Sequence, residues 1–337
     1  MPGRKTWGVC TAFLTLHVLA LFYAFQETNS PPAFLIWKGA LWLWSRIHPV
    51  GETQCLPLPF HAKHKEPKLS IAIFQVYDKP LPPTRTSWWG LSAALCAHYA
   101  NRHGYYYQYL FVSSTNGFVK YGHRQRTLHW ARIPLLRHFL LQQSFDWFLY
   151  LDIDAMINPT QMRFPLTWIL SSTTANTRCI IRGNTSSDPH LIFFSNAPQE
   201  PHMPCSGIFM ISNKSASSLD VWWHHPVDAY FDQNSEFDQH SLHEAIYYYP
   251  PSVFNAVVMD IRGFDFHTAS SFFLHFSGNR VSDNASTYHH FYHMVLSRIS
   301  KALGPNGLRM VLAQPIFQHA CSFDADEIPH CLSAILV

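Results

Sequence analysis

The chain has 337 residues, of which 47% are hydrophobic and 15% aromatic, enough for a sizeable buried core. Only 13% of the residues are charged and the formal net charge is +3, which argues against extended disorder and against a nucleic-acid-binding surface. Because the sequence contains 22 histidines, histidine as a residue type does not by itself mark a site.

The N-terminal segment predicts entry into the secretory pathway. Arg4 and Lys5 precede a mostly apolar run at residues 7–25, which is long enough to cross a membrane as a helix. Because flanking basic residues favour the cytosolic side, we expect a cytosolic tail at 1–6, a transmembrane signal anchor at 7–25 and a lumenal stem at 26–66. A cleaved signal peptide is the alternative, although no clear small-residue cleavage motif follows the run.

Glycosylation motifs and cysteines agree with a lumenal location. Asn-x-Ser/Thr triplets begin at Asn184, Asn213 and Asn284. Of the 7 cysteines, Cys10 lies in the expected anchor and the others can pair in an oxidising lumen. Cys321 and Cys331 are close enough in sequence to close a small loop, but sequence alone does not fix the connectivity. The cysteines form no C-x-x-C pair, so a zinc site is not indicated.

Alternating strands and helices begin near residue 69, and we expect one catalytic domain at 67–337. Apolar or aromatic runs predict strands at 69–76, 105–112 and 145–151, with helices around 91–99 and at 127–142 between them. This order predicts an α/β fold with a mixed, mostly parallel sheet flanked by helices on both faces. Later strands are expected at 179–182, 191–195, 207–212, 256–260 and 272–276, and a helix at 288–302.

The strongest local feature is Asp152-Ile153-Asp154, directly after the apolar run at 145–151. The carboxyl ends of strands in an open α/β sheet are where ligands bind, and side chains two positions apart in extended backbone share a face. Two carboxylates placed there can hold one hard cation such as Mn²⁺ or Mg²⁺. The alternative is that Asp152 and Asp154 merely cap a loop, since so short a motif is not specific.

Several ordered motifs resemble glycosyltransferase family 34. They are WARIPLLR at 130–137, FDWFLYLDIDA at 145–155, CSGIFMI at 205–211, FDQ at 237–239 and LHFSG at 274–278. This family includes fungal α-galactosyl- and α-mannosyltransferases and plant xyloglucan xylosyltransferases. The resemblance covers roughly residues 69–280. It implies a Rossmann-like GT-A fold, a nucleotide-sugar donor, Mn²⁺ and retention of anomeric configuration.

The resemblance also implies a metal site. Asp152 and Asp154 would be metal ligands, and His275 would be the third, because the family places a metal-binding histidine near the end of its catalytic domain. The alternative for His275 is an ordinary core or surface histidine. Its place between an apolar run and Gly278, where backbone can approach a phosphate, favours the ligand role.

Further roles follow from the matching positions. Asp238 and Gln239 would face the donor sugar and the acceptor as catalytic residues, although Phe237 replaces the first acid of the family's acidic pair. The alternative for Asp238 is a carboxylate at a helix start. Nucleotide-sugar binding would fall to Tyr77, Asp78, Arg132, Asp152 and Gly278. Arg132 would contact phosphate, with a solvated helix position as its alternative. The family's later basic residue has only Arg280 as its counterpart.

The combined prediction is a metal-dependent, retaining glycosyltransferase of the Golgi membrane, with a single-pass type II anchor. It would move a hexose or pentose from a UDP- or GDP-sugar to a glycan acceptor. Expected partners are that donor, that acceptor, the membrane and, as an option, a complex with other glycosyltransferases. One alternative is a non-catalytic subunit of a glycan-synthesising complex, suggested by Phe237. Another is a haloacid dehalogenase-type phosphatase, which Met156 disfavours because that class has Thr or Val there.

Overall fold

The computed structural model describes residues 69–82, 87–114, 117–122, 124–142, 145–171, 179–181, 190–197, 200–225, 237–249, 254, 256–259, 271–276, 285–323, 329–331 and 335–336. The predicted anchor at 7–25 and stem at 26–66 lie outside these residues, as do Asn184, Gly278, Arg280 and Asn284. Within the described residues, no helix combines the length and the hydropathy that crossing a membrane requires.

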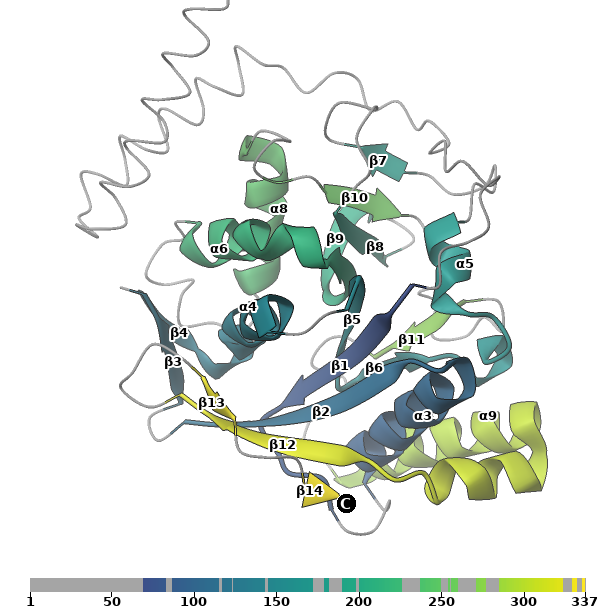
Figure 1. Ribbon diagram of the computed structural model, residues 1–337. Helices are drawn as coiled ribbons and strands as arrows, with labels where there is room; N and C mark the ends of the chain where they lie inside the picture. The colour runs from purple at the N-terminus through teal and green to yellow at the C-terminus, as the bar shows by residue number, and fades with distance from the viewer. Residues whose placement is uncertain are drawn as a thin grey trace, which may run out of the picture.

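The described part of the chain alternates strands and helices (Figure 1). The strands are β1 Ile71–Tyr77, β2 Tyr106–Ser113, β3 Phe118–Tyr121, β4 Arg124–Thr127, β5 Trp147–Asp152, β6 Ala155–Ile157, β7 Cys179–Ile181, β8 Leu191–Ala197, β9 Glu200–Ser212, β10 Ala256–Met259, β11 Phe273–His275, β12 Phe317–Ser322, β13 His330–Cys331 and β14 Ile335–Leu336. The helices are α3 Trp88–His103, α4 Arg132–Gln142, α5 Leu166–Ser171, α6 Ala216–His224, α8 Phe237–Tyr248 and α9 Ala285–Leu312, with 3₁₀ turns η1 Leu128–Ala131, η2 Pro159–Gln161 and η3 Asn213–Ser215.

One 10-stranded sheet organises the described residues, in the order β13-β12-β2-β1-β5-β9-β8-β10-β7, with β14 paired to β12. The pairings β12–β2, β2–β1 and β1–β5 are parallel, whereas β9 runs antiparallel to both β5 and β8. The prediction of an α/β fold with a mixed, mostly parallel sheet is therefore confirmed. Two small antiparallel pairs, β6–β11 and β3–β4, lie outside this sheet.

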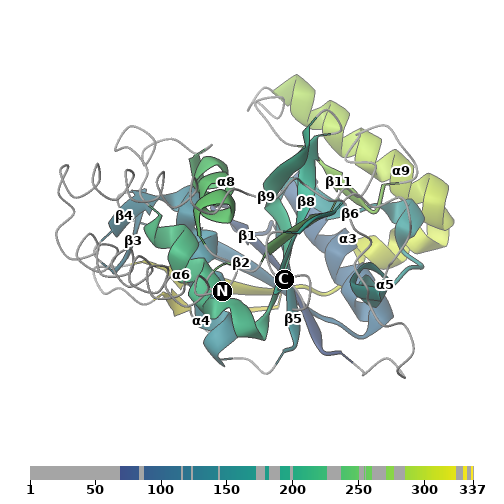
Figure 2. The same ribbon diagram turned by 90° about the horizontal axis from the view of Figure 1, so that it is seen from above.

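Helices cover both faces of the sheet (Figure 2). One face packs against α3 and α9, and a separate hydrophobic cluster on the other face includes residues of α4, α6 and α8. The helix expected around 91–99 is confirmed as part of α3, where Leu91, Leu95 and Tyr99 are fully buried. Ser87 caps the start of α3 through its Oγ, and Gly104 ends it in the left-handed region at φ 69°.

Several elements differ from the expected boundaries. The helix expected at 127–142 is divided, because η1 precedes an α-helix that starts at Arg132. The strand expected at 207–212 begins earlier, at Glu200. The helix expected at 288–302 extends to Leu312, but Gly304, at φ 70° and ψ 177°, breaks its regular geometry before Pro305. The β3–β4 pair and the strands after α9 were not expected.

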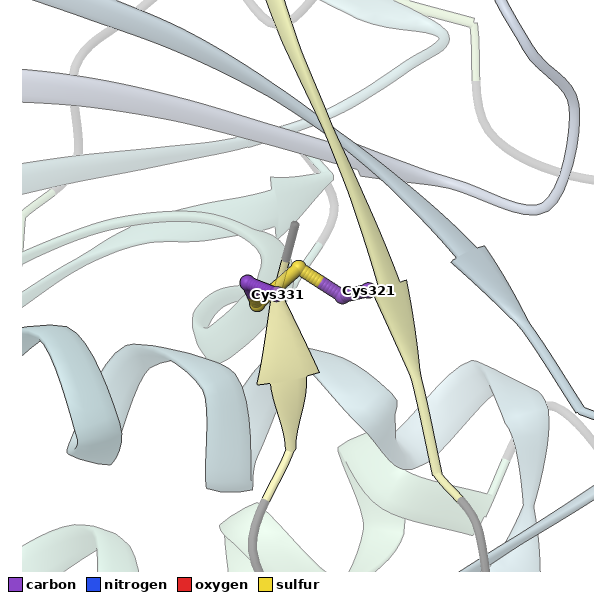
Figure 3. The surroundings of a disulfide bond; sticks show 2 residues. All are labelled: Cys321 and Cys331. Atoms are coloured by element: carbon purple, nitrogen blue, oxygen red, sulfur yellow. A yellow bond between two sulfur atoms is a disulfide. The ribbon is translucent and has the colours of Figure 1, made fainter. Parts of the chain in front are cut away.

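The C-terminal strands complete one side of the sheet. β12 lies parallel to β2, with Gln318 in register with Tyr109, and β13 pairs with β12. A disulfide joins Cys321 of β12 to Cys331 of β13 (Figure 3) and closes a small loop, one of the pairings that the sequence left open. Cys96 and Cys205 are free and buried among the described residues.

Candidate active site

A tight turn follows the central strand β5. Asp152 is the last residue of β5, and the chain turns through Ile153 and Asp154 into β6. The buried Gln75 side chain holds this turn from the neighbouring strand, because its Nε2 donates to the carbonyl oxygens of Asp152 at 3.3 Å and Ala155 at 3.0 Å. The Tyr107 hydroxyl in turn donates to Gln75 Oε1 at 2.7 Å. The two carboxylates therefore stand on a fixed backbone.

The short β6–β11 pair brings His275 to this turn. His275 lies in register with Ala155, and the next residue, Phe276, donates its backbone N–H to the Asp154 carbonyl at 3.0 Å. The imidazole Nε2 lies 3.4 Å from Asp154 Oδ1, and the His275 side chain is only 7% exposed. Pairing between distant segments of the chain thus places the histidine beside both acids.

Three side chains at this point converge on a common centre. One ligand atom each from Asp152, Asp154 and His275 lies within 4.8 Å of the other two. Gly207 of β9 lies against them, since a Cβ at that position would stand 2.5 Å from Asp152 Oδ2 and 3.0 Å from His275 Nε2. Two carboxylates and one imidazole suit a hard divalent cation, and the missing side chain of Gly207 leaves room for the ligand atoms. The residues present therefore fit a metal.

Arg132, at the start of α4, links two acids of the site. Its buried guanidinium pairs with Asp152 Oδ1 at 2.6 Å and with Asp238. It also lies 3.4 Å from the Ser206 hydroxyl oxygen, and the Tyr150 hydroxyl donates to Asp152 Oδ1 at 2.5 Å. The solvated helix position considered from the sequence is therefore wrong. Arg132 orients carboxylates, and its contact with phosphate stays a prediction.

The charges of the cluster shift the pKa values of its members. Burial alone would raise the pKa of Asp152, but the charge of Arg132, followed by that of His275, outweighs burial and lowers this pKa. Burial alone would lower the pKa of His275, but its contacts with Cys205 and Asp154 raise this pKa well above the ordinary value. The site therefore keeps Asp152 ionised, and a cation bound there would displace a proton from His275.

The two predicted catalytic residues lie in the first turn of α8. Asp238 is 2% exposed, and its backbone carbonyl accepts a hydrogen bond from Trp222 Nε1 at 2.9 Å. Gln239 Oε1 accepts hydrogen bonds from the backbone N–H and hydroxyl of Ser206, at 3.3 and 3.4 Å. Asp238 is therefore a helix-start carboxylate that also reaches the site through Arg132, and its catalytic role stays a prediction.

Tyr77 and Asp78 lie at the carboxyl end of β1, next to the carboxyl end of β5. Val76 of β1 is in register with Asp152, and Tyr77 ends that strand beside the rings of Trp88 and Trp89. Asp78 is exposed just beyond. The structure thus places both near the end of the strand adjacent to β5, while their nucleoside contact stays a prediction.

Several polar residues of the site were not predicted from the sequence. His129 lies between charges, since burial and Arg132 lower its pKa while Asp152 and Asp78 act in the opposite direction. Gln75, Ser206 and Cys205 are buried and bonded to site residues. A glutamine inside the apolar run at 69–76 was a usable signal, because a buried amide needs hydrogen-bond partners. The partner of Cys205 lies far along the chain and left no local signal.

Comparison with protein-family models gives one match. The model of the galactosyl transferase GMA12/MNN10 family matches residues 96–264, which include β2, α4, β5 and the first turn of α8. No curated protein matches the chain. The family match confirms the resemblance seen in the motifs and favours a transferase over the two alternatives.

Among solved structures, the chain is similar to a glycosyltransferase involved in the glycosylation of the major capsid of PBCV-1. The identity is 18%, the TM-score 0.45, and the match covers 66% of this chain and 99% of the other. It is also similar to the glycosyltransferase GlyE of Streptococcus pneumoniae TIGR4, at 11% identity and a TM-score of 0.37, over 71% of this chain and 64% of GlyE.

Proposed function

Because this chain belongs to glycosyltransferase family 34, the galactosyl transferase GMA12/MNN10 family, and is a glycosyltransferase, we propose that it transfers a sugar from a nucleotide sugar to a glycan acceptor with the help of a divalent metal. The observation that supports a metal ion is that the side chains of Asp152, Asp154 and His275 converge beside Gly207. Mn²⁺ is our first choice of ion and Mg²⁺ the second, since the ligand set combines carboxylate oxygens with one imidazole nitrogen.

Each group of the site has a proposed task. Bound between the three ligands, a divalent ion would neutralise the diphosphate that leaves the sugar. Arg132 holds Asp152 in the ionised state and keeps Asp238 beside it, so that these carboxylates are ordered before the donor binds. The side-chain oxygen of Gln239 accepts a hydrogen bond from the Ser206 hydroxyl. Its NH₂ group would therefore donate to a hydroxyl of the transferred sugar or of the acceptor.

Family membership supports a proposal for the donor and for the stereochemistry. We propose a UDP- or GDP-sugar as donor and retention at the anomeric carbon. In such a reaction the acceptor hydroxyl attacks from the face that the diphosphate leaves. Tyr77 and Asp78 are the proposed nucleoside contacts, since Tyr77 ends the strand beside β5 and Asp78 follows it. Gly278 is retained as a proposed phosphate contact on the family motif alone.

Replacement of one ligand tests the metal-dependent function. In the full chain purified in detergent, nucleotide release from a panel of UDP- and GDP-sugars should require Mn²⁺. Asp154→Asn should reduce this release by at least roughly 100-fold, because loss of a ligand removes the charge that the ion contributes to the leaving group. The measurement is nucleotide release per molecule of folded protein, with and without a chelator.

A second aspartate on the same strand segment provides the control. Asp146 precedes β5 at its other end, where its Oδ2 accepts hydrogen bonds from the backbone N–H and hydroxyl of Ser70, both at 2.8 Å. Asp146→Asn should leave nucleotide release per folded molecule unchanged. Release that is equal in chelator, or equal in Asp154→Asn and the unsubstituted chain, would contradict the proposal.

We also propose that the protein resides in the Golgi membrane as a single-pass type II protein with a lumenal catalytic domain. The support is the basic start, the apolar run at 7–25 and the glycosylation motifs, of which Asn213 is exposed in η3. In cells, the protein should stay in the membrane after carbonate extraction and lose mass on glycosidase treatment. An N-terminal epitope tag should remain attached, since its loss would instead indicate a cleaved signal peptide.

A further inference from the structure

A buried thiol lies directly behind the histidine of the site. Cys205 Sγ stands 3.5 Å from His275 Nδ1, on the ring nitrogen that does not face Asp154. Cys205 is fully buried and His275 is 7% exposed. The imidazole is therefore held at both nitrogens, by a sulfur on one side and by a carboxylate on the other.

The strand that carries Cys205 also contacts the rest of the site. Three successive residues of β9 contact it: Cys205 touches His275, Ser206 touches Gln239, and Gly207 lies against Asp152 and His275. β9 pairs with β8 on either side of Cys205, at Pro204 and at Phe209, and with β5 from Ile208 onwards. The register between β8 and β9 shifts in the segment that contains Cys205, and the pairings on either side hold that segment against the imidazole.

A histidine that binds a metal through one nitrogen needs a partner for the other. The N–H on the second nitrogen sets which tautomer is present and which way the ring faces. We infer that Cys205 is a positioning residue that accepts the Nδ1–H of His275 and so keeps Nε2 available to a divalent cation held with Asp152 and Asp154. This inference rests on the proposed metal-dependent function.

Two other roles for Cys205 fit the geometry less well. As a metal ligand it would have to lie with the carboxylates, but the cluster of converging ligand atoms contains Asp152, Asp154 and His275, and the sulfur is at the opposite nitrogen of the ring. As a disulfide partner it would need another cysteine, and in the described residues Cys205 is free while Cys321 pairs with Cys331. The remaining role is support of the imidazole.

Metal affinity of the full chain tests this role without relying on turnover. Mn²⁺ is titrated into the detergent-purified protein and the free ion is measured by electron paramagnetic resonance. Cys205→Ala should weaken Mn²⁺ binding by roughly 10-fold or more, which is the usual effect of removing a partner of a metal-bound histidine. Cys205→Ser should restore the affinity to within a few-fold, because a hydroxyl also accepts the Nδ1–H.

Cys96 provides a matched control. It is also a fully buried free cysteine, but it lies on α3, in the hydrophobic cluster that packs α3 and α9 against the sheet. Cys96→Ala should leave Mn²⁺ affinity unchanged whatever it does to stability. Nucleotide release gives a second readout: Cys205→Ala should need more Mn²⁺ for half-maximal rate while its rate at saturating Mn²⁺ changes less.

The outcomes separate the inference from the function on which it rests. If Mn²⁺ binds with an affinity that depends on Asp154 but not on Cys205, the positioning role is wrong and the proposed function stands. If no Asp154-dependent binding occurs, the metal-dependent function itself is wrong. Should Cys205→Ala not fold, the isosteric pair Cys205→Val and Cys205→Thr replaces it. Equal affinity in those two variants would overturn the role of a hydrogen-bond acceptor.

Discussion

Two arginines that lie close together in the sequence are both buried, yet they have different kinds of partner. Arg132 pairs with two carboxylates, that of Asp152 at the carboxyl end of β5 and that of Asp238 in the first turn of α8. Arg126, on β4, donates to the carbonyl oxygens of Trp223, at 3.0 and 2.7 Å, and of His225, at 2.9 Å, at the end of α6. The first arrangement orders groups that can do chemistry, whereas the second fastens the β3–β4 hairpin to a helix.

The difference follows from what each partner needs. Carbonyls at the end of a helix lack intrahelical donors and carry partial negative charge, so that a guanidinium there satisfies and stabilises them. Arg124 adds a donor to the His225 carbonyl at 3.2 Å, and the ring of Trp130 lies 3.8 Å from the Arg126 guanidinium carbon. Burial of an arginine therefore does not indicate a functional site, whereas its pairing with carboxylates at a strand end does.

The largest effect is expected from removing each arginine in turn. Arg132→Met should lower the free energy of unfolding by about 3–5 kcal/mol, because it leaves the buried carboxylate of Asp238 and the partly buried carboxylate of Asp152 without their counter-charge. Activity per folded molecule should also fall, by roughly 10-fold or more. Denaturant unfolding measures the first effect, and nucleotide release, normalised to the folded fraction, measures the second.

Arg126→Met is the matched variant. It should lower the free energy of unfolding by about 1–3 kcal/mol, since carbonyls at the end of α6 lose their donor, but leave activity per folded molecule unchanged. If the two variants lose activity per folded molecule to the same extent, the conclusion that Arg132 orders the site while Arg126 only joins β4 to α6 is wrong.

A smaller effect is expected from pH. Burial lowers the pKa of His225 to about 4; its hydrogen bond to Glu244 opposes this shift, and the charges of Arg124 and Arg126 add to it. The unfolded chain then takes up a proton near the ordinary histidine pKa, before the folded protein does. Stability should therefore be lost as pH falls from about 6.5 towards 4, by up to roughly 3 kcal/mol.

The pH dependence of stability tests the contact between β4 and the end of α6, because His225 is the residue whose carbonyl accepts hydrogen bonds from Arg124 and Arg126. His225→Gln should flatten the fall in unfolding free energy between pH 7 and 5. The control is His293→Gln, which replaces an exposed histidine on α9 and should keep the original slope. An unchanged slope in His225→Gln would assign the acid sensitivity to other groups.

The parts of the fold that the sequence predicted are those with a strong local pattern. The apolar runs at 69–76 and 145–151 match the buried strands β1 and β5. The two acids that follow the second run lie together at the carboxyl end of β5, as expected. The β4 strand was not predicted because its buried positions carry charged instead of apolar residues: Arg124 and Arg126 are buried, and Gln125 between them is exposed. Such a pattern is stable only once α6 supplies acceptors from far along the chain.

The site divides in the same way. Asp152 and Asp154 could be found from their place after a strand, and His275, Asp238 and Gln239 only from the family motifs. Arg132 was found as a residue of the site, but its pairing with two acids was not. Ionic and sulfur contacts between β9, α4, α8 and β11 depend on the register of distant strands, which local periodicity does not encode.

The position of β12 has a consequence for how the protein is made. This strand lies beside β2, yet nearly the whole domain is synthesised between them. A nascent chain still attached to the ribosome must therefore keep one side of β2 unpaired until β12 emerges. Such a delay exposes an open strand edge, with which other chains can pair before β12 does.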